Sequence, residues 1–182
     1  IARVCRALRN QGRWEQAGWV EHELLGFNYR LDELSCALGI VQLERLGETQ
    51  AQRERVARWY HERLRDLEAV ELLPTVPGLT RSWFVYVIRL RPPLGQEARD
   101  RTMAALREQG VECADYFAPI HLQPVYQRRF GYRRGDFPVT EDIAGRSLAL
   151  PFFAHMSESQ VDEVVRTLKS VLTRSTSRAT GA

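Results

Sequence analysis

A helical pattern of apolar residues over residues 31–70 limits the possible folds of this chain more than any other feature of its sequence. Apolar residues recur there every three or four positions, which is the spacing of one buried helix face. They are Leu31, Leu34, Leu38, Val41, Val56, Tyr60, Leu64 and Leu67. The pattern predicts one long helix, or two helices end to end with a kink near Gly47, and it predicts that Cys36 is buried.

The residues after this helix have the pattern of a small module that contains both strands and helices. Two prolines and a glycine within residues 71–80 end the helix. Residues 81–90 and 110–117 are rich in aromatic and β-branched side chains, so both are predicted to be strands. Between them, residues 97–109 have the spacing of an amphipathic helix.

The last third of the chain begins with an irregular segment and ends with a helix. Residues 118–140 are rich in proline and aromatic residues and follow no regular period. A short helix from Glu141 and a short strand near Leu148 are expected next. Ser157 lies three residues before Gln160, which is the spacing of a capping box and predicts the start of the final helix.

Together these patterns predict an α/β chain that ends in a small α+β domain. We expect two or three strands to form a sheet and helices to cover one of its faces. This domain is expected over residues 71–172, followed by a disordered tail over 173–182. The long helix over 31–70 precedes it, and residues 1–30 include a loop over 13–26 that is long enough to suggest a function.

The charged residues do not favour a polyanionic partner. The chain has 26 basic and 23 acidic residues, so its net charge is only +3. The segment QRRFGYRRGD interleaves arginines with Phe130 and Tyr132, which is a composition found in some nucleic-acid-binding loops. We favour a solvated loop or a loop that contacts a phosphorylated small ligand, and we expect no nucleic-acid partner.

The sequence lacks the signatures of membrane and metal proteins. No run of about 18 apolar residues occurs, so no transmembrane helix is expected. Cys5, Cys36 and Cys113 are far apart, and no group of histidines and cysteines has the spacing of a metal site. Free thiols are typical of proteins in the reducing cytoplasm, which is the expected location.

Asn28, Tyr29 and Arg30 form a polar and aromatic group at the start of the long helix. Arginine presents a planar fork of donors that matches carboxylate or phosphate, and helix N-termini bind anions. In the alternative interpretation, Asn28 caps the turn and Arg30 pairs with Asp32 or Glu33. These residues alone leave both an anion site and a structural corner open.

His121 is the second candidate for a functional residue. It lies between Pro119 and Pro124, among aromatic residues. A lone histidine in a loop is usually a surface hydrogen-bonding group, but the prolines stiffen its position, which suits a ligand contact. Both interpretations stay open at this point.

Four segments of the chain resemble, in the same order, motifs of the DegT/DnrJ/EryC1/StrS sugar aminotransferases. They are RALRNQGR (6–13), GFNYRLDELSCALGIVQLERL (26–46), DYFAPIHLQPVYQ (115–127) and AGRSLALPFFAHMSESQVDEVVRTL (144–168). The resemblance covers the chain from Ala2 to Leu172. It departs from the family pattern at Gln11, where histidine is usual, and at Ala154, where proline is usual.

The resemblance implies that this chain is the C-terminal part of a pyridoxal 5'-phosphate (PLP) enzyme with the type I aminotransferase fold. Members of the family transfer an amino group from glutamate or glutamine to a keto sugar, usually one linked to a nucleotide. They work as homodimers. The resemblance also implies that residues 1–30 end the large cofactor domain and carry an active-site loop, and that the helix over 31–70 joins domains or subunits.

The resemblance assigns roles to five residues of this chain. It implies that Asn28 contacts the cofactor phosphate across the dimer and that Tyr29 lines the same cofactor site. It implies that Arg30, His121 and Tyr116 bind the substrate.

No catalytic residue is expected in this chain. The family's Schiff-base lysine lies upstream of the position that matches Ile1, and the only lysine here, Lys169, falls in the last helix. We therefore expect a PLP-dependent sugar aminotransferase as the full-length protein and an inactive chain by itself. Two alternatives remain: a PLP-dependent sugar dehydratase of the same family, or a non-catalytic binding or dimerisation module.

Overall fold

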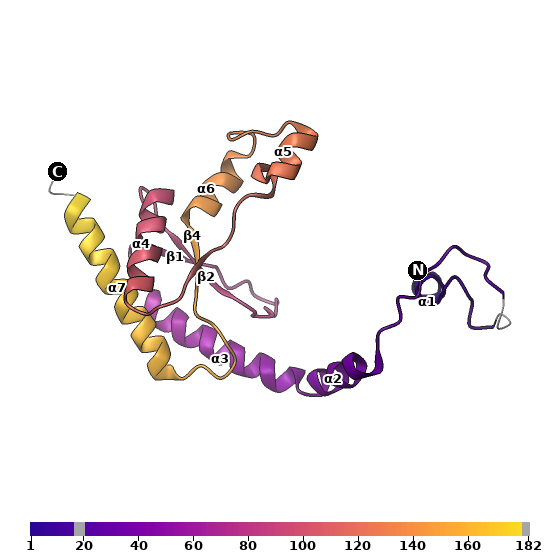
Figure 1. The fold of residues 1–182 in the computed structure, drawn as a ribbon. Helices are drawn as coiled ribbons and strands as arrows, with labels where there is room; N and C mark the ends of the chain where they lie inside the picture. Colours follow the sequence, from indigo (N-terminus) through magenta and orange to yellow (C-terminus); the bar gives the residue numbers. More distant parts are fainter. Residues whose placement is uncertain (17–20, 180–182) are drawn as a thin grey trace. The chain divides into compact units, whose positions relative to one another are not determined.

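The computed structural model describes residues 1–16 and 21–179, in two compact units, Ile1–Gly47 and Glu48–Ala182 (Figure 1). The predicted loop over 13–26 lies only partly within the described residues. Among the described residues, no helix combines the length and apolar character needed to cross a membrane.

In the first unit, helix α1 (Ala2–Arg9) ends at a close crossing of two backbone segments. After the helix the chain turns through Gln11 and Gly12, which have positive φ values of 62° and 79°. It then returns alongside α1, where Phe27 N–H donates to Leu8 O at 2.8 Å. A Cβ atom on Gly12 would lie 1.7 Å from Leu24 O, so only glycine fits this crossing.

Helix α2 (Glu33–Glu44) follows the crossing, and none of its residues is buried. Asp32 caps its N-terminus by accepting hydrogen bonds from Ser35 N–H and Ser35 Oγ, both at 2.8 Å. The hydrogen bond from the Ser35 backbone N–H is the main cause that lowers the pKa of Asp32. The prediction that Cys36 is buried is wrong, because nothing in the described chain covers this helix. Its apolar residues are likewise exposed: Leu34, Leu38, Ile40, Val41 and Leu43.

The long helical pattern forms two helices rather than one. Helix α2 ends at Glu44 and helix α3 spans Leu46–Leu64, so the break falls at Arg45, close to the kink expected near Gly47. Helix α3 differs from α2 in that Val56, Ala57, Tyr60 and Leu64 are buried.

The second unit contains a four-stranded antiparallel sheet in the order β1-β2-β4-β3. The strands are β1 (Val70–Leu72), β2 (Tyr86–Leu90), β3 (Ala114–Asp115) and β4 (Ser147–Leu150). The mixed α/β class is as predicted, but the prediction of two or three strands is wrong. Strand β1 was missed because it is short and directly precedes the two prolines.

The helices of this unit agree in part with the sequence pattern. The predicted helices correspond to α4 (Gln96–Glu108), α6 (Pro138–Arg146) and α7 (Glu158–Ala179). The capping box of α7 is present, since Gln160 N–H donates to Ser157 Oγ at 3.2 Å and Ser157 N–H donates to Gln160 Oε1 at 2.8 Å. A 3₁₀ helix (Ile120–Leu122) and α5 (Pro124–Phe130) occupy the segment expected to be irregular.

The end of α7 differs from the disordered tail predicted over 173–182. The helix continues to Ala179, while residues 180–182 lie outside the described chain. Val171 and Leu172 are buried and hold this part of the helix against the core, and Thr173 Oγ1 donates to Lys169 O at 2.9 Å.

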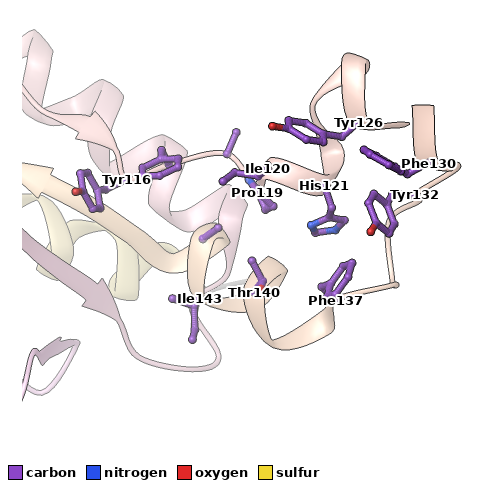
Figure 2. Close-up of a pocket in the computed structure, with 13 residues that line it drawn as sticks. Tyr116, Pro119, Ile120, His121, Tyr126, Phe130, Tyr132, Phe137, Thr140 and Ile143 are labelled. Carbon is purple, nitrogen blue, oxygen red and sulfur yellow. The ribbon is translucent and has the colours of Figure 1, made fainter. Parts of the chain in front are cut away.

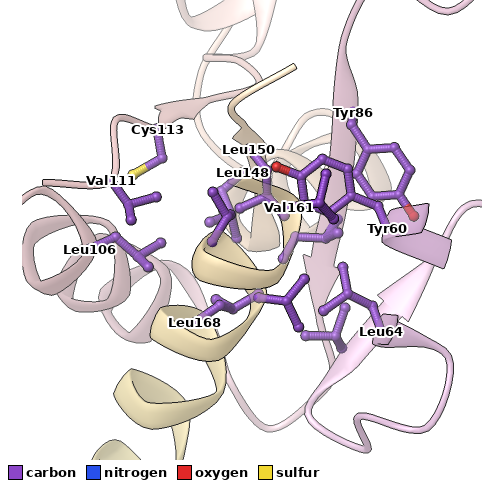
Figure 3. Packing of buried hydrophobic residues seen from close by; sticks show 14 of the residues in the cluster. Tyr60, Leu64, Tyr86, Leu106, Val111, Cys113, Leu148, Leu150, Val161 and Leu168 are labelled. Atoms are coloured by element: carbon purple, nitrogen blue, oxygen red, sulfur yellow. The ribbon is translucent and has the colours of Figure 1, made fainter. Parts of the chain in front are cut away.

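The core of the second unit lies between the sheet and helices α3, α4 and α7 (Figure 3). Along β2 the buried and half-buried residues alternate, so Tyr86, Ile88 and Leu90 face the core. The Tyr60 ring stacks on Tyr86 with centroids 4.7 Å apart, and the Tyr60 hydroxyl donates to Pro151 O at 2.8 Å. The buried hydroxyl is therefore hydrogen-bonded, as a buried polar group requires.

We predict that Leu168→Ala lowers the free energy of unfolding of this chain by about 2–5 kcal/mol, because it opens a cavity in the core. Leu168 is 0% exposed in α7, whereas Leu34 in α2 is 84% exposed. Leu34→Ala is therefore the matched control and should change stability little. Urea denaturation followed by circular dichroism measures both, and equal losses for the two variants would contradict the described core.

We predict that Gly12→Ala opens the crossing in the first unit, since its Cβ would collide with Leu24 O. The amide of Phe27, which donates to Leu8 O, should lose protection from hydrogen exchange. Gly39→Ala is the control, because no atom lies within 4 Å of that Cβ position and alanine favours the helix by about 1 kcal/mol. Unchanged protection in Gly12→Ala would show that the crossing is not required.

Candidate functional site

The residues predicted to bind the cofactor lie in the first unit, at the backbone crossing. Asn28 pairs with Asn10 in an isolated β-bridge, and Tyr29 N–H donates to Arg9 O at 2.8 Å. Arg30 Nη1 donates to Asn10 Oδ1 at 2.7 Å. The backbone therefore fixes the positions of residues 28–30, while their side chains are exposed.

In the part of the chain that it describes, the structure does not show the contacts of the alternative interpretation, in which Asn28 caps the turn and Arg30 pairs with Asp32 or Glu33. Asp32, and not Asn28, caps the following helix. Arg30 contacts the Asn10 amide, and within the described chain it forms no ion pair with Asp32 or Glu33. The Asn28 side-chain amide has no hydrogen-bond partner among the described residues. Both side chains therefore keep donors available for an anion.

The second group of predicted residues lines a cavity of about 650 Å³ in the second unit (Figure 2). The cavity lies between the loop after β3, helix α5 and helix α6. Tyr116 and His121, to which the resemblance assigns substrate binding, both line it. Most of the other lining side chains are aromatic or apolar: Phe117, Ile120, Tyr126, Phe130, Tyr132, Phe137 and Ile143.

His121 is held between aromatic rings in this cavity, as Figure 2 shows. Its ring centroid lies 4.7 Å from that of Phe137 and 6.3 Å from that of Tyr132. Its Nε2 atom lies 2.9 Å from Glu141 Oε1. His121 is only 8% exposed, so it is not the surface group that a lone loop histidine usually is.

Glu141 joins His121 to the turn that precedes α6. Its carboxylate accepts the Gly135 N–H at 2.8 and 3.0 Å and the Phe137 N–H at 3.4 Å. Desolvation alone would raise the pKa of Glu141, but the hydrogen bonds from His121 and these amides outweigh it, so the pKa is lowered. Sequence reasoning identified Glu141 only as a helix start, because its contact with His121 spans 20 residues.

A smaller, more polar cavity of about 190 Å³ adjoins Glu141. Its charged lining residues are Arg99, Asp115, Arg134 and Glu141. Arg128, Arg129, Arg133 and Arg134 are exposed, as a solvated segment requires.

Two further reactive groups, Lys169 and Cys113, lie outside both of these cavities. Lys169 is exposed on α7. Among residues 1–16 and 21–179, no group of three or more His, Cys, Asp or Glu side chains could hold a metal ion. Cys113 is buried, and its burial raises the pKa of the thiol, so it is a packing residue.

Residues 1–169 match the family model of the DegT/DnrJ/EryC1/StrS aminotransferases. The chain belongs to this family. The match includes both the corner at residues 28–30 and the cavity around His121. Members of the family are PLP-dependent aminotransferases.

Relatives within the family support the same assignment. The erythromycin biosynthesis sensory transduction protein EryC1 of Saccharopolyspora erythraea is 35% identical over 93% of this chain and 44% of its own length. GDP-perosamine synthase of Caulobacter vibrioides is 33% identical over 94% of this chain and 45% of its own length. The chain thus spans less than half of the curated relatives that it matches.

The fold is that of solved members of the family. The crystal structure of S. venezuelae DesV matches 93% of this chain with a TM-score of 0.81 and 27% sequence identity. The match covers 43% of DesV, a share similar to that of the curated relatives. The predicted fold, part of a type I PLP-dependent aminotransferase, is therefore confirmed.

We predict that the Gly135 amide resonance shifts with acid at a midpoint below 4.5, the ordinary pKa of a glutamate. The lowered pKa of Glu141 means that its hydrogen bonds stabilise the folded loop above pH 4.5 and are lost as the pH falls through the lowered value. An NMR titration measures the midpoint. In Glu141→Gln this transition should disappear. A midpoint at or above 4.5 in the unmodified chain would contradict the described contacts.

Proposed function

We propose that this chain is the C-terminal part of a PLP-dependent aminotransferase that acts on a keto sugar, usually one linked to a nucleotide. The amino donor is glutamate or glutamine, the enzyme is a homodimer, and it works in the cytoplasm. The observation that carries the proposal is the family match over residues 1–169, which includes both candidate sites. The coverage of about 44% of the relatives supports its being one part of the catalytic protein.

The corner at residues 28–30 fits the phosphate group of PLP. The exposed Asn28 side-chain amide has no hydrogen-bond partner among the described residues. Amide N–H groups are suitable phosphate donors. In this proposal Asn28 reaches the phosphate of the neighbouring subunit and Tyr29 lines the same cofactor site. PLP, when bound, supplies the electron sink for the reaction.

The covalent attachment of PLP needs a lysine that this chain does not offer. Lys169, the only lysine of the sequence, is exposed on α7 and lines neither the cavity around His121 nor the one beside Glu141. We propose that the Schiff-base lysine belongs to the part of the protein that precedes Ile1. The 182-residue chain by itself is then a non-catalytic module.

The exposure of the apolar residues of helix α2 supports the proposal that another part of the protein packs against the first unit. Its apolar residues lie all round the helix, and such helices are normally covered. We propose that the rest of the aminotransferase and its second subunit cover them. This explains why the helical pattern predicted burial that the described chain alone does not have.

The cavity in the second unit is the proposed site for the sugar substrate, with Tyr116 and His121 as binding residues. Its volume of about 650 Å³ is in the range of small-molecule sites. Arg30 is the third proposed substrate-binding residue. The aromatic lining with a few polar groups suits a ligand that has both apolar and hydroxylated surfaces.

We predict that Asn28→Ala in the full-length protein weakens PLP binding about tenfold or more, because a hydrogen bond to a charged phosphate is lost. Fluorescence titration of the apo-enzyme with PLP measures the Kd. Gln52→Ala is the control, since this amide contacts Glu48 on α3 and has no role in the proposed site. An unchanged Kd in Asn28→Ala would contradict the assignment.

The contact across the dimer has its own test. Asn28→Ala subunits are mixed with subunits that lack the Schiff-base lysine, and aminotransferase activity on a nucleotide-linked keto sugar is measured. If Asn28 acts across the dimer, the mixed dimer has one intact site and one site that lacks both groups. If Asn28 acts within its own subunit, each of the two sites lacks one group. Activity in the mixture above that of both parents supports the contact, and no recovery argues against it.

A further inference from the structure

The pair formed by His121 and Glu141 separates two cavities of different chemistry. His121 lines the aromatic cavity of about 650 Å³, and Glu141 lines the polar cavity of about 190 Å³. Neither residue lines the other's cavity. The side chains of both are at least nine-tenths buried, with 8% and 10% of their surface exposed. A ligand in the aromatic cavity therefore meets His121 and does not meet Glu141 directly.

The hydrogen bonds of Glu141 determine which nitrogen of His121 carries the proton. The carboxylate accepts from two backbone amides, and its Oε1 atom also lies 2.9 Å from His121 Nε2. An ionised carboxylate is only an acceptor. The Nε2 atom must therefore be the donor, so the neutral ring carries its proton on Nε2 and has an acceptor lone pair on Nδ1.

The Nδ1 atom is available to a ligand. No described residue forms a hydrogen bond with it, and it does not belong to the buried polar atoms that lack a partner. Phe137 and Tyr132 contact the ring on its sides and restrict its rotation. Since His121 lines the aromatic cavity and not the polar one beside Glu141, its accessible nitrogen serves the aromatic cavity.

We propose that Glu141 is a positioning residue that acts through His121, holding it as the Nε2–H tautomer so that Nδ1 accepts a hydrogen bond from a hydroxyl or N–H group of the ligand. The identity of that ligand as the sugar substrate rests on the proposed function. The arrangement favours a ligand that places a hydrogen-bond donor next to His121 Nδ1. A lone pair on Nδ1 does not bind a phosphate or carboxylate oxygen, because these oxygens are themselves acceptors. A ligand without that donor would bind about tenfold more weakly.

The tautomer is tested by NMR of the full-length protein labelled with ¹⁵N-histidine. The chain contributes only four histidines, and the signal absent from His121→Gln assigns His121. We expect a protonated Nε2 and a non-protonated Nδ1 at neutral pH, with a slowly exchanging Nε2 proton. Glu141→Gln keeps an acceptor oxygen and should keep this spectrum, whereas Glu141→Leu should lose the slow exchange.

Asp136→Asn is the matched control, because Asp136 accepts a backbone N–H from Arg133 in the same turn but does not contact His121. It should leave the His121 signals unchanged. A proton on Nδ1 of the unmodified protein, or slow Nε2 exchange that survives in Glu141→Leu, overturns the role of Glu141. The first of these results does not depend on whether Glu141→Leu folds.

Steady-state kinetics of the full-length enzyme test the ligand separately. With a nucleotide-linked keto sugar as substrate, Glu141→Leu should raise the KM for the sugar about tenfold, leave the KM for glutamate unchanged, and be rescued by Glu141→Gln. If the NMR result holds but the KM for the sugar does not change, the assignment of this cavity to the sugar is overturned. If the enzyme is inactive on keto sugars in its unmodified form, the proposed function fails, and the tautomer result still decides the role of Glu141.

Discussion

The burial of strand β4 in the middle of the sheet is the constraint on which the second unit and its site depend. All of its residues are buried, and β2 and β3 pair with it on either side. Helix α6 runs directly into β4, so the carbonyl groups in the last turn of α6 lie next to the core. Arg99 donates to Ala144 O at 3.1 Å, and Arg146 donates to Leu90 O at 2.7 Å, which satisfies acceptors that burial would otherwise leave without partners. With α6 fixed in this way, Glu141 on its first turn is fixed too, and through it His121.

The sequence was sufficient to predict those elements whose contacts join residues close together in the chain. The capping box at Ser157 and the amphipathic helix over 97–109 depend on residues three or four positions apart, and both are present. The predicted strand over 110–117 shrinks to Ala114–Asp115, and β1 was missed, because a strand is defined by its partner in another part of the chain. The link between His121 and Glu141 was missed for the same reason.

The two halves of the long helical pattern show what periodicity can and cannot predict. Both α2 and α3 carry apolar residues at helical spacing, and both are helices. In α3 these residues contact the sheet, whereas in α2 they contact solvent within the described chain. Periodicity thus identified both segments as helices, but whether their apolar residues are buried depends on which part of the protein packs against them. For the candidate site, the residue pattern singled out Asn28 and His121 and the resemblance assigned their roles, while their contacts required the structure.

At the backbone crossing in the first unit, some positions can tolerate substitution and others cannot. The positions of residues 28–30 depend on main-chain bonds such as that from Tyr29 N–H to Arg9 O, which every residue except proline can form. Gly12 and Gly26, in contrast, leave no space for a Cβ atom. Substitutions can therefore replace the exposed side chains of residues 28–30 without rebuilding the corner, so the same backbone frame can present side chains of different chemistry.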